Sequence, residues 1–363
     1  MVSSGLELHG GGRTLLGRLL AAGCASHARE HGLSFSILSL GSEDAAYRPP
    51  APARYARGRR TVLACRTLAA QLGRRSPAIV FDLLGPARVQ SLLPRSLQSP
   101  YLVAMLGIEV WRPLSPTRRR ALAGSAIRLA ISETTRRLAL PHLPANARDC
   151  EVLHLALEER PPSGEADDAL LSRVGSDFLL MVGRMSTLEA YKGHDRILEA
   201  LSRLTASAER ARALPTLVVA GGGDDRPRLE ARARELGLTD RVAFTGHVSE
   251  ATLRRLYERC AAFVMPSRGE GFGLVYLEAM RAGKACVALR GTVAEEIVVD
   301  GVTGRLVDPA APEELAAAIV DLVGDPEQAR RLGAAGRKRL AERFPYARFE
   351  AGLHGHLDRL TAL

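Results

Sequence analysis

Two glutamates and a run of glycines in the second half of the chain have a pattern that could bind a sugar phosphate. Glu270 and Glu278 bracket the segment 271–273, GFG. The apolar run 261–265 before it and the helically spaced apolar residues from Leu274 onward predict a strand, a loop and a helix. Amides at a helix N-terminus suit an anion, and carboxylates accept hydrogen bonds from hydroxyls. The alternative interpretation is an ordinary loop beside a solvated helix face.

The residues around this loop resemble a known enzyme family. The segment EGFGLVYLE at 270–278 is similar to the E-x7-E motif of the retaining glycosyltransferases of family 4, which have the GT-B architecture. Upstream, VGRM and YKGHD place Arg184 and Lys192 like the basic pair with which that family clamps the donor diphosphate. Downstream, residues 291–309 resemble the segment that closes the domain. Four motifs in the same order are more specific than a single Gly-rich loop.

The resemblance covers almost all of residues 175–345 and implies a role for each matching position. It implies that the catalytic residues are Glu270, Arg184 and Lys192. It implies that Glu270 holds sugar hydroxyls, that Glu278 holds ribose hydroxyls and that the nucleobase lies near Val248 and Glu250. The implied donor-binding residues are Gly183, Gly271, Phe272, Gly273, Leu274, Glu278, Val248, Glu250, Gly11 and Gly12.

Four residues of the N-terminal half are candidates for binding the acceptor. Asp82 and Glu109 follow predicted strands, and the carboxyl ends of parallel strands are where α/β sheets bind ligands. A capping or turn role is the alternative for both carboxylates. His9 precedes the glycines 10–12, and Trp111 could stack on an acceptor or pack in the core. In the segment 105–111, which resembles the family's acceptor loop, Leu106 stands where His is usual.

Strands that alternate with helices along the whole chain predict parallel sheets with helices on both faces. Together with the resemblance, this indicates an α/β protein of GT-B type, with two Rossmann-like doubly wound domains facing a central cleft. We expect an acceptor-binding domain at 1–165 and a nucleotide-sugar-binding domain at 173–345, joined by the Pro- and acid-rich segment 158–168. The resemblance implies that the last helix, 346–363, packs back on the first domain.

Several elements of the first domain are predicted from local pattern. Nine residues precede the glycines at 10–12, so the first strand is expected to be short. Residues 33–40 alternate as a strand does, and 85–93 are predicted to be helical. The segment 41–60 is rich in Pro, Ala and Arg and is expected to be a surface loop.

Composition and charge limit the remaining choices. The chain has 363 residues and a net charge of +10, and residues 51–150 hold 17 Arg against 4 acidic residues. This excess indicates either a base-composition bias or a surface for an anionic acceptor or membrane. Five scattered cysteines without a CxxC pair argue against a zinc site or a disulfide framework. With no apolar run near the length of a spanning helix, we expect a cytoplasmic protein, with peripheral contact to the inner membrane face as an option.

The resemblance implies a retaining, metal-independent hexosyltransferase that takes a hexose from GDP-mannose or a UDP-hexose. The expected acceptor is a glycan or lipid-linked glycan in surface polysaccharide or glycolipid biosynthesis. No cofactor or metal is expected, because the family binds its donor without one and Asp224-Asp225 is better explained as a turn and helix cap. A phosphorylase or sugar-nucleotide epimerase of the same architecture is one alternative. A nucleic-acid-binding protein is a weaker one, because no DNA-binding motif accompanies the arginines.

Overall fold

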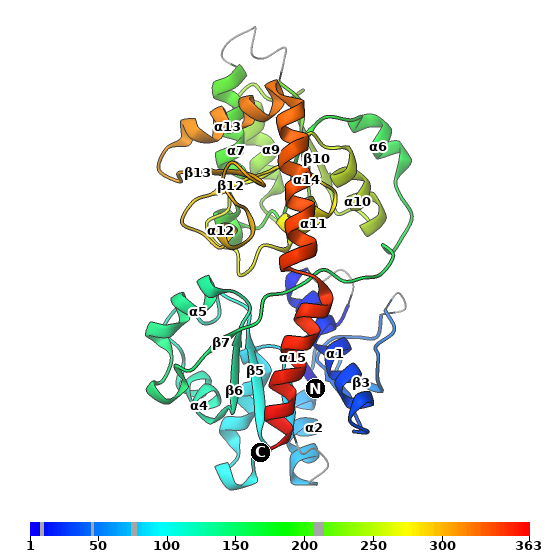
Figure 1. Ribbon diagram of the computed structural model, residues 1–363, viewed down its shortest axis with the longest axis vertical. Helices are drawn as coiled ribbons and strands as arrows, with labels where there is room; N and C mark the ends of the chain where they lie inside the picture. Colours follow the sequence, from blue (N-terminus) through cyan, green and yellow to red (C-terminus); the bar gives the residue numbers. More distant parts are fainter. Residues whose placement is uncertain (8–10, 45–46, 74–77, 206–213) are drawn as a thin grey trace. The chain divides into compact units, whose positions relative to one another are not determined.

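A computed structural model describes residues 1–7, 11–44, 47–73, 78–205 and 214–363 of the chain. These residues form two compact domains. The first domain consists of Met1–Glu158 and Phe344–Leu363, and the second consists of Glu159–Arg343 (Figure 1). The chain therefore leaves the first domain at Glu158 and returns to it at Phe344, whereas the predicted domain ends are 165 and 345.

The first domain contains a sheet of seven parallel strands in the order β3-β2-β1-β4-β5-β6-β7. In chain order the strands are β1 Val2–Ser3, β2 Ile37–Ser39, β3 Ala53–Tyr55, β4 Ile79–Phe81, β5 Tyr101–Met105, β6 Ile127–Ala130 and β7 Glu151–Val152. The α-helices are α1 Gly12–Glu30, α2 Arg60–Leu72, α3 Leu84–Ala87, α4 Pro116–Gly124, α5 Glu133–Ala139 and α15 Tyr346–Thr361. The expected short first strand is present, since β1 has two residues.

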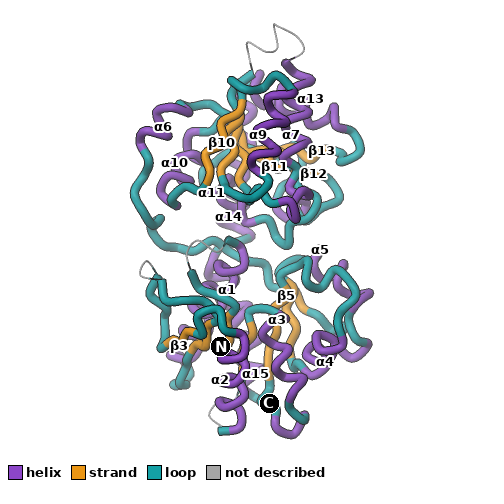
Figure 2. Tube along the Cα trace, turned by 180° about the vertical axis from the view of Figure 1, so that it is seen from behind, coloured by secondary structure: helices purple, strands orange, loops and turns teal. Residues whose placement is uncertain are grey.

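Helix α15 comes from the end of the chain and lies along α1 from its beginning, as both views of the fold show (Figures 1 and 2). Leu353 and Leu357 of α15 are buried. Gly23 of α1 leaves room for Leu353, because a Cβ atom at Gly23 would lie 2.6 Å from the Leu353 Cδ2 atom. The contact between these helices is therefore a close one.

The second domain contains a sheet of six parallel strands in the order β10-β9-β8-β11-β12-β13. The strands are β8 Leu179–Val182, β9 Leu217–Ala220, β10 Val242–Gly246, β11 Ala262–Met265, β12 Cys286–Leu289 and β13 Gly304–Val307. Its helices are α6 Asp168–Val174, the 3-10 helix η5 Thr187–Lys192, α7 His194–Thr205, α9 Arg226–Glu235, α10 Glu250–Arg259, α11 Leu274–Arg281, α12 Ala294–Ile297, α13 Pro312–Gly324 and α14 Pro326–Arg343.

Local sequence explains why these elements form. Strands β11 and β12 are buried along their whole length, as expected for parallel strands that are covered on both faces. Helix α7 buries Ile197, Leu201 and Leu204 at helical spacing, and its other face is half-buried or exposed. Helix α10 begins after Ser249, whose hydroxyl accepts a hydrogen bond from the Thr252 amide at 3.0 Å.

Three local predictions in the first domain are confirmed only in part. The segment 41–60 is not a loop throughout, because it contains β3, which pairs with β2. A three-residue strand at the sheet edge tolerates the surrounding prolines that suggested a loop. The strand predicted at 33–40 is limited to β2. The helix predicted at 85–93 is a short α-helix, α3, followed by the 3-10 helix η1 Arg88–Leu92. In the part of the chain that the structure describes, no helix combines the length and the apolar character needed to cross a membrane.

Candidate functional site

The predicted residues of the second domain gather at the carboxyl ends of its parallel strands. Gly183 and Arg184 follow β8, Val248 and Glu250 follow β10, and Glu270 follows β11. The strand order reverses between β8 and β11, because the chain proceeds outward from β8 in one direction and then restarts at β11 in the other. Open α/β sheets bind ligands outside the carboxyl edge at such a reversal. The fold therefore points to the loops after β8 and β11.

An ion pair joins these two loops. The Lys192 Nζ atom lies 2.8 Å from Glu270 Oε1, and the exposed fractions of the two side chains are 15% and 18%. Ser267 also donates a hydrogen bond to Glu270 Oε1, at 3.3 Å. Two residues 78 positions apart in the sequence thus meet across the reversal point with both charges largely shielded from water. Shielding strengthens each charge as a binding group for a ligand that reaches it.

Glycines allow the two loops to pack closely. Gly193 follows Lys192 with a left-handed backbone (φ 89°), and a Cβ atom there would lie 2.2 Å from the Pro266 carbonyl oxygen. The amide of Arg268 donates to the Tyr191 carbonyl at 2.8 Å. A Cβ atom at Gly269 would lie 2.7 Å from the Tyr191 ring. These contacts hold the Lys192 segment against the loop that carries Glu270.

The other predicted cation, Arg184, has a different partner. Its Nη2 atom lies 2.6 Å from Glu189 Oε1, and the Arg184 side chain is 66% exposed. Charged groups of both ion pairs act on the hydroxyl of Tyr191. Burial, with help from the charges of Glu189 and Glu270, raises the pKa of Tyr191 to about 12, and Arg184 opposes that shift. The neighbourhood of Tyr191 thus includes Lys192 and the loop that carries Glu270, and the charges of Arg184 and Glu189 act on it.

His194 belongs to this neighbourhood and was not among the predicted site residues. Its ring is buried at the start of α7, and a Cβ atom at Gly183 would lie 3.9 Å from its Nε2 atom. Within the described ranges, Nε2 has no hydrogen-bond partner. Burial and the charge of Lys192 lower the pKa of His194 to about 4, so the ring is neutral at pH 7. The signal in the sequence is its place in the YKGHD segment.

The loop after β11 leads into α11 as predicted. Gly273 precedes α11 with a left-handed backbone (φ 94°), and a Cβ atom there would lie 2.7 Å from the Tyr276 ring. Phe272 is buried, and Gly271 and Leu274 are half-buried. The first amides of a helix lack acceptors within that helix, so this N-terminus adjoins the Lys192–Glu270 pair with groups suited to an anion.

Glu278 contacts a different set of side chains from Arg184, Lys192 and Glu270. The Tyr257 hydroxyl donates a hydrogen bond to Glu278 Oε2 at 2.9 Å. Burial raises the pKa of Glu278, and the bond from Tyr257 opposes that shift. Together with Arg254, Arg281 and other residues, Glu278 lines a pocket of about 410 Å³. Lys192 and Glu270 are therefore in direct contact, whereas Arg184 pairs with Glu189 and Glu278 bonds to Tyr257. That all four charged residues bind one ligand stays a prediction.

The residues that follow β10 are tied to the start of the second domain. Glu250 accepts hydrogen bonds from Arg160 at 2.6 Å and from the amide and hydroxyl of Ser163, both at 2.9 Å. Burial alone would raise the pKa of Glu250, but these bonds outweigh it and leave the pKa lowered. Val248 is half-buried two residues earlier. Their roles near a nucleobase stay predictions.

In the first domain, Asp82 lies at the corresponding reversal, between β1 and β4. Its Oδ2 atom accepts hydrogen bonds from the Ser3 hydroxyl at 2.8 Å and from the Ser4 amide at 2.7 Å. The carboxyl is fully buried, which raises its pKa to about 6. These contacts favour the structural alternative for Asp82, and its predicted contact with an acceptor stays a prediction that burial weighs against.

The other first-domain candidates lie in a turn, against the hydrophobic core or at the surface. Glu109 accepts a hydrogen bond from the Leu106 amide at 2.6 Å, so it closes the turn after β5. Trp111 is half-buried and packs against the hydrophobic core. Gly11 and Gly12 are exposed at the start of α1, and His9 lies outside the described residues. The acceptor-binding and donor-binding roles of these residues stay predictions.

Comparison with known proteins agrees with this geometry. Residues 164–339 match the family model "Glycosyl transferases group 1". The chain is 35% identical over 199 residues to a GDP-mannose-dependent alpha-(1-6)-phosphatidylinositol monomannoside mannosyltransferase of Mycolicibacterium smegmatis, which covers 50% of this chain and 51% of the relative. It is 37% identical over 174 residues to a glycogen synthase of Mycobacterium tuberculosis, covering 48% of this chain and 40% of the relative. The chain thus spans about half of the curated relatives it matches, or less.

Solved structures match nearly the whole chain at low sequence identity. A sucrose-phosphate synthase from Thermosynechococcus elongatus has a TM-score of 0.78 at 21% identity and covers 99% of this chain and 96% of its own. The Anabaena protein HepE in complex with UDP and glucose has a TM-score of 0.75 at 17% identity and covers 98% of both chains. With two doubly wound parallel sheets, these neighbours confirm the predicted GT-B fold. Through residues 164–339, this chain is similar to the group 1 glycosyl transferases.

Proposed function

We propose that this protein is a hexosyltransferase that moves a hexose from a nucleoside-diphosphate sugar to a glycan or lipid-linked acceptor. The observation that carries the proposal is the Lys192–Glu270 pair, which joins the loops after β8 and β11 at the reversal of the second sheet. A cation there can meet a pyrophosphate, and a carboxylate beside it can accept hydrogen bonds from sugar hydroxyls. The match of residues 164–339 to the group 1 glycosyl transferases supports the same reaction class.

The charges of the loops suit the leaving group of such a transfer. As the bond between the sugar C1 atom and the phosphate oxygen breaks, negative charge grows on the diphosphate. Lys192 and Arg184 supply positive charge there, and stabilisation of developing charge is often the largest contribution to catalysis. The helix N-terminus after Gly273 adds amide donors. Glu189 and Glu270 hold the two cations in place before the ligand arrives.

We propose that transfer proceeds with retention and without a metal ion, as the family resemblance implies. The acceptor hydroxyl then attacks C1 from the face that the phosphate leaves, and its proton passes to the departing phosphate oxygen. No protein base is needed for this step, so Leu106 in place of a histidine does not prevent it. Asp224 and Asp225 support the absence of a metal requirement, because Asp224 accepts a hydrogen bond from Thr187 and Asp225 pairs with Arg228.

For the donor nucleotide and the acceptor, we propose a chemical class and not a single compound. The Mycolicibacterium relative is named for GDP-mannose and the Anabaena structure contains UDP and glucose, so both donor classes enter the test. Glu278 is proposed to hold the ribose hydroxyls, with its carboxylate oriented by Tyr257. The arginine-rich segment 51–150 suits an anionic lipid-linked acceptor or an anionic membrane surface.

A thermal-shift panel tests the proposal directly. Purified protein is heated with UDP, GDP, ADP and their hexose conjugates, each without added metal and with EDTA. We expect one nucleoside diphosphate and its sugar to raise the Tm in a saturable way. The sugar that does so is then incubated with acceptor extracts without phosphate, and transfer of labelled hexose is measured. No shift with any nucleotide would contradict the proposal, and turnover that requires inorganic phosphate would indicate a phosphorylase instead.

A further inference from the structure

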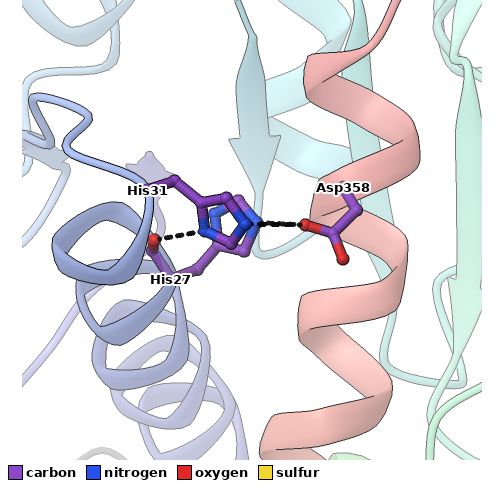
Figure 3. Close-up of side chains that lie close together, drawn as sticks. All are labelled: His27, His31 and Asp358. Carbon is purple, nitrogen blue, oxygen red and sulfur yellow. Dashed lines mark hydrogen bonds and ion pairs between the residues drawn. The ribbon is translucent and has the colours of Figure 1, made fainter.

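Two imidazoles and a carboxylate meet in the first domain, away from every residue assigned to the transfer reaction. His27 lies in the last turn of α1, His31 directly follows the helix, and Asp358 faces both from α15 (Figure 3). His27 Nε2 is 2.8 Å and His31 Nε2 is 3.5 Å from Asp358 Oδ1. The three atoms lie within 4.8 Å of one another. The two rings are stacked with their centroids 4.2 Å apart, so both Nε2 atoms point the same way.

The hydrogen bond of His31 to a backbone carbonyl determines which of its ring nitrogens carries the hydrogen and which one faces Asp358 with a lone pair. His31 Nδ1 lies 3.0 Å from the His27 carbonyl oxygen. A carbonyl oxygen can only accept, so Nδ1 carries the hydrogen. In the neutral ring, Nε2 then presents a lone pair to a carboxylate oxygen 3.5 Å away. The two lone pairs repel each other, and a cation between them, either a proton on the ring or a metal ion, relieves that repulsion.

We propose that His27 Nε2, His31 Nε2 and Asp358 Oδ1 bind one divalent transition-metal ion of the zinc type, which links α15 to α1. Zinc binds imidazole nitrogen at about 2.0–2.1 Å and carboxylate oxygen at about 2.0–2.2 Å. In a tetrahedron of that size the ligand atoms are about 3.3 Å apart. The separation of His31 Nε2 and Asp358 Oδ1 is already close to this value, and that of His27 Nε2 and Asp358 Oδ1 has to lengthen by about half an ångström as the Nε2 proton leaves.

The surroundings of the three groups resemble those of metal-bound histidines. A backbone carbonyl that accepts the second N–H of a ligating imidazole orients the ring and raises its basicity, and the His27 carbonyl does this for His31. His354 of α15 lies edge-on to His27, with its Nδ1 atom 3.3 Å from Glu30 Oε2. Glu30 adds negative charge beside the site without being one of its three ligands. Two nitrogens and one oxygen suit Zn²⁺, Ni²⁺, Co²⁺ and Cu²⁺ more than Mg²⁺ or Ca²⁺.

Burial decides how an ion reaches the site and what it changes. The His27 side chain is 4% exposed, whereas those of His31 and Asp358 are 49% and 55% exposed. One ligand is therefore held rigidly in the contact between the helices, and the other two leave an entry and a fourth position for water. Because Asp358 is separated from His27 by 331 residues, a bound ion fastens the end of the chain to its beginning. This is a structural role, independent of the proposed transfer reaction.

Metal titration of the full-length chain tests the site. EDTA-treated, dialysed protein is titrated with ZnCl₂ by calorimetry, and Co²⁺ is added separately as a spectroscopic probe. We expect one saturable Zn²⁺ site per chain and visible Co²⁺ bands without the near-ultraviolet bands of a thiolate ligand. His31→Ala and Asp358→Asn should each weaken binding by tenfold or more, and both should fold because these side chains are half-exposed. His142→Ala, which removes a half-buried imidazole outside the cluster, should bind like the wild type.

Each opposite result overturns the inference. Absence of a saturable site in the wild type does so, and so does unchanged binding in both His31→Ala and Asp358→Asn. Thiolate bands with Co²⁺ would place the ion at a cysteine instead. Equal loss of binding in His142→Ala would indicate nonspecific coordination by surface imidazoles. Nucleotide binding is measured in parallel, because its failure would concern the transfer reaction and leave the metal titration interpretable.

Discussion

Lys192 and Glu270 form a contact that has both a binding and a stabilising role. Their charges lie 2.8 Å apart and are mostly shielded from water. Removing one member of a shielded pair leaves the other charge without its partner, which is costly. The same shielding makes Lys192 effective against a diphosphate. Any substitution of Lys192 or Glu270 should therefore be tested for both activity and stability.

We predict that Lys192→Ala lowers the turnover number by about 10²-fold or more, because the charge that develops on the leaving diphosphate loses its partner. The matched control is Lys338→Ala, which removes an exposed lysine of α14 whose partner is Glu342, one turn away. Hexose transfer is measured for both variants at a temperature well below each Tm. Wild-type turnover in Lys192→Ala would contradict the assignment of the site.

The raised pKa of Asp82 should make the free energy of unfolding depend on pH. Its pKa is 3.8 in an exposed setting and about 6 in the folded protein, where burial disfavours the charged form. The folded state therefore binds more protons than the unfolded state between these values. The free energy of unfolding should fall as the pH rises from about 4 to about 6, by about 2–3 kcal/mol from this one group.

Asp82→Asn should remove this contribution, because an amide does not titrate. Urea denaturation of the wild type and of Asp82→Asn is compared at several pH values from 4 to 7. Asp240→Asn, which replaces an exposed carboxylate, controls for the substitution itself. The stability advantage of the wild type over Asp82→Asn should shrink with rising pH, and an advantage that grows with pH would show that the sign is wrong.

At the scale of elements, the loop that carries Lys192 is positioned by its contact with the segment after β11. Gly193 and Gly291 both have left-handed backbones, with φ values of 89° and 73°. A Cβ atom at Gly193 would meet the Pro266 carbonyl oxygen, whereas one at Gly291 would meet nothing within 4 Å. Replacing either glycine by alanine thus strains the backbone in the same way. Only at Gly193 does the added Cβ atom also collide with a neighbour.

We predict that Gly193→Ala lowers the free energy of unfolding by about 1–3 kcal/mol more than Gly291→Ala does, because the Lys192 loop must shift away from Pro266. Both variants are unfolded in urea under the same conditions. Gly193→Ala should also weaken binding of the nucleoside diphosphate identified in the thermal-shift panel, whereas Gly291→Ala should not. Equal stability of the two variants would mean that the loops are not in close contact.

How much the sequence could predict depends on the length and regularity of each element. The unit β11–loop–α11 was predictable because buried strands, glycines and helical spacing follow one another there without interruption. The strand β3 was not, because three residues among prolines carry little pattern. Motif resemblance identified Lys192 and Glu270. The ring of His194, the Tyr257 partner of Glu278 and the meeting of Asp358 with His27 depend on contacts between distant segments, which no local pattern records.

The whole molecule consists of one domain built from a continuous segment, Glu159–Arg343, and one built from both ends of the chain. Helix α15 completes the first domain by packing on α1. Its buried side chains include Phe349, Leu353 and Leu357. Full burial of such side chains stabilises a fold by roughly 1.5–3 kcal/mol each.

We predict that truncation after Arg343 destabilises the first domain and leaves the second folded, because the apolar face of α1 loses its cover. Limited proteolysis followed by mass spectrometry compares the truncated chain with the full-length chain. Cleavage should become faster within Met1–Glu158 and stay unchanged within Glu159–Arg343. If cleavage within Met1–Glu158 is unchanged, α15 is not needed for the stability of the first domain.

Hydrogen exchange with and without a nucleoside diphosphate shows whether the loops after β8 and β11 bind the donor. The full-length chain is labelled in D₂O with saturating UDP or GDP, as the thermal-shift panel selects, and the exchange of each peptide is read by mass spectrometry. We predict slowed exchange in residues 183–193 and 266–274, the loops after β8 and β11, and loss of this protection in Lys192→Ala. Protection confined to other segments, or the same protection in Lys192→Ala, would contradict this prediction.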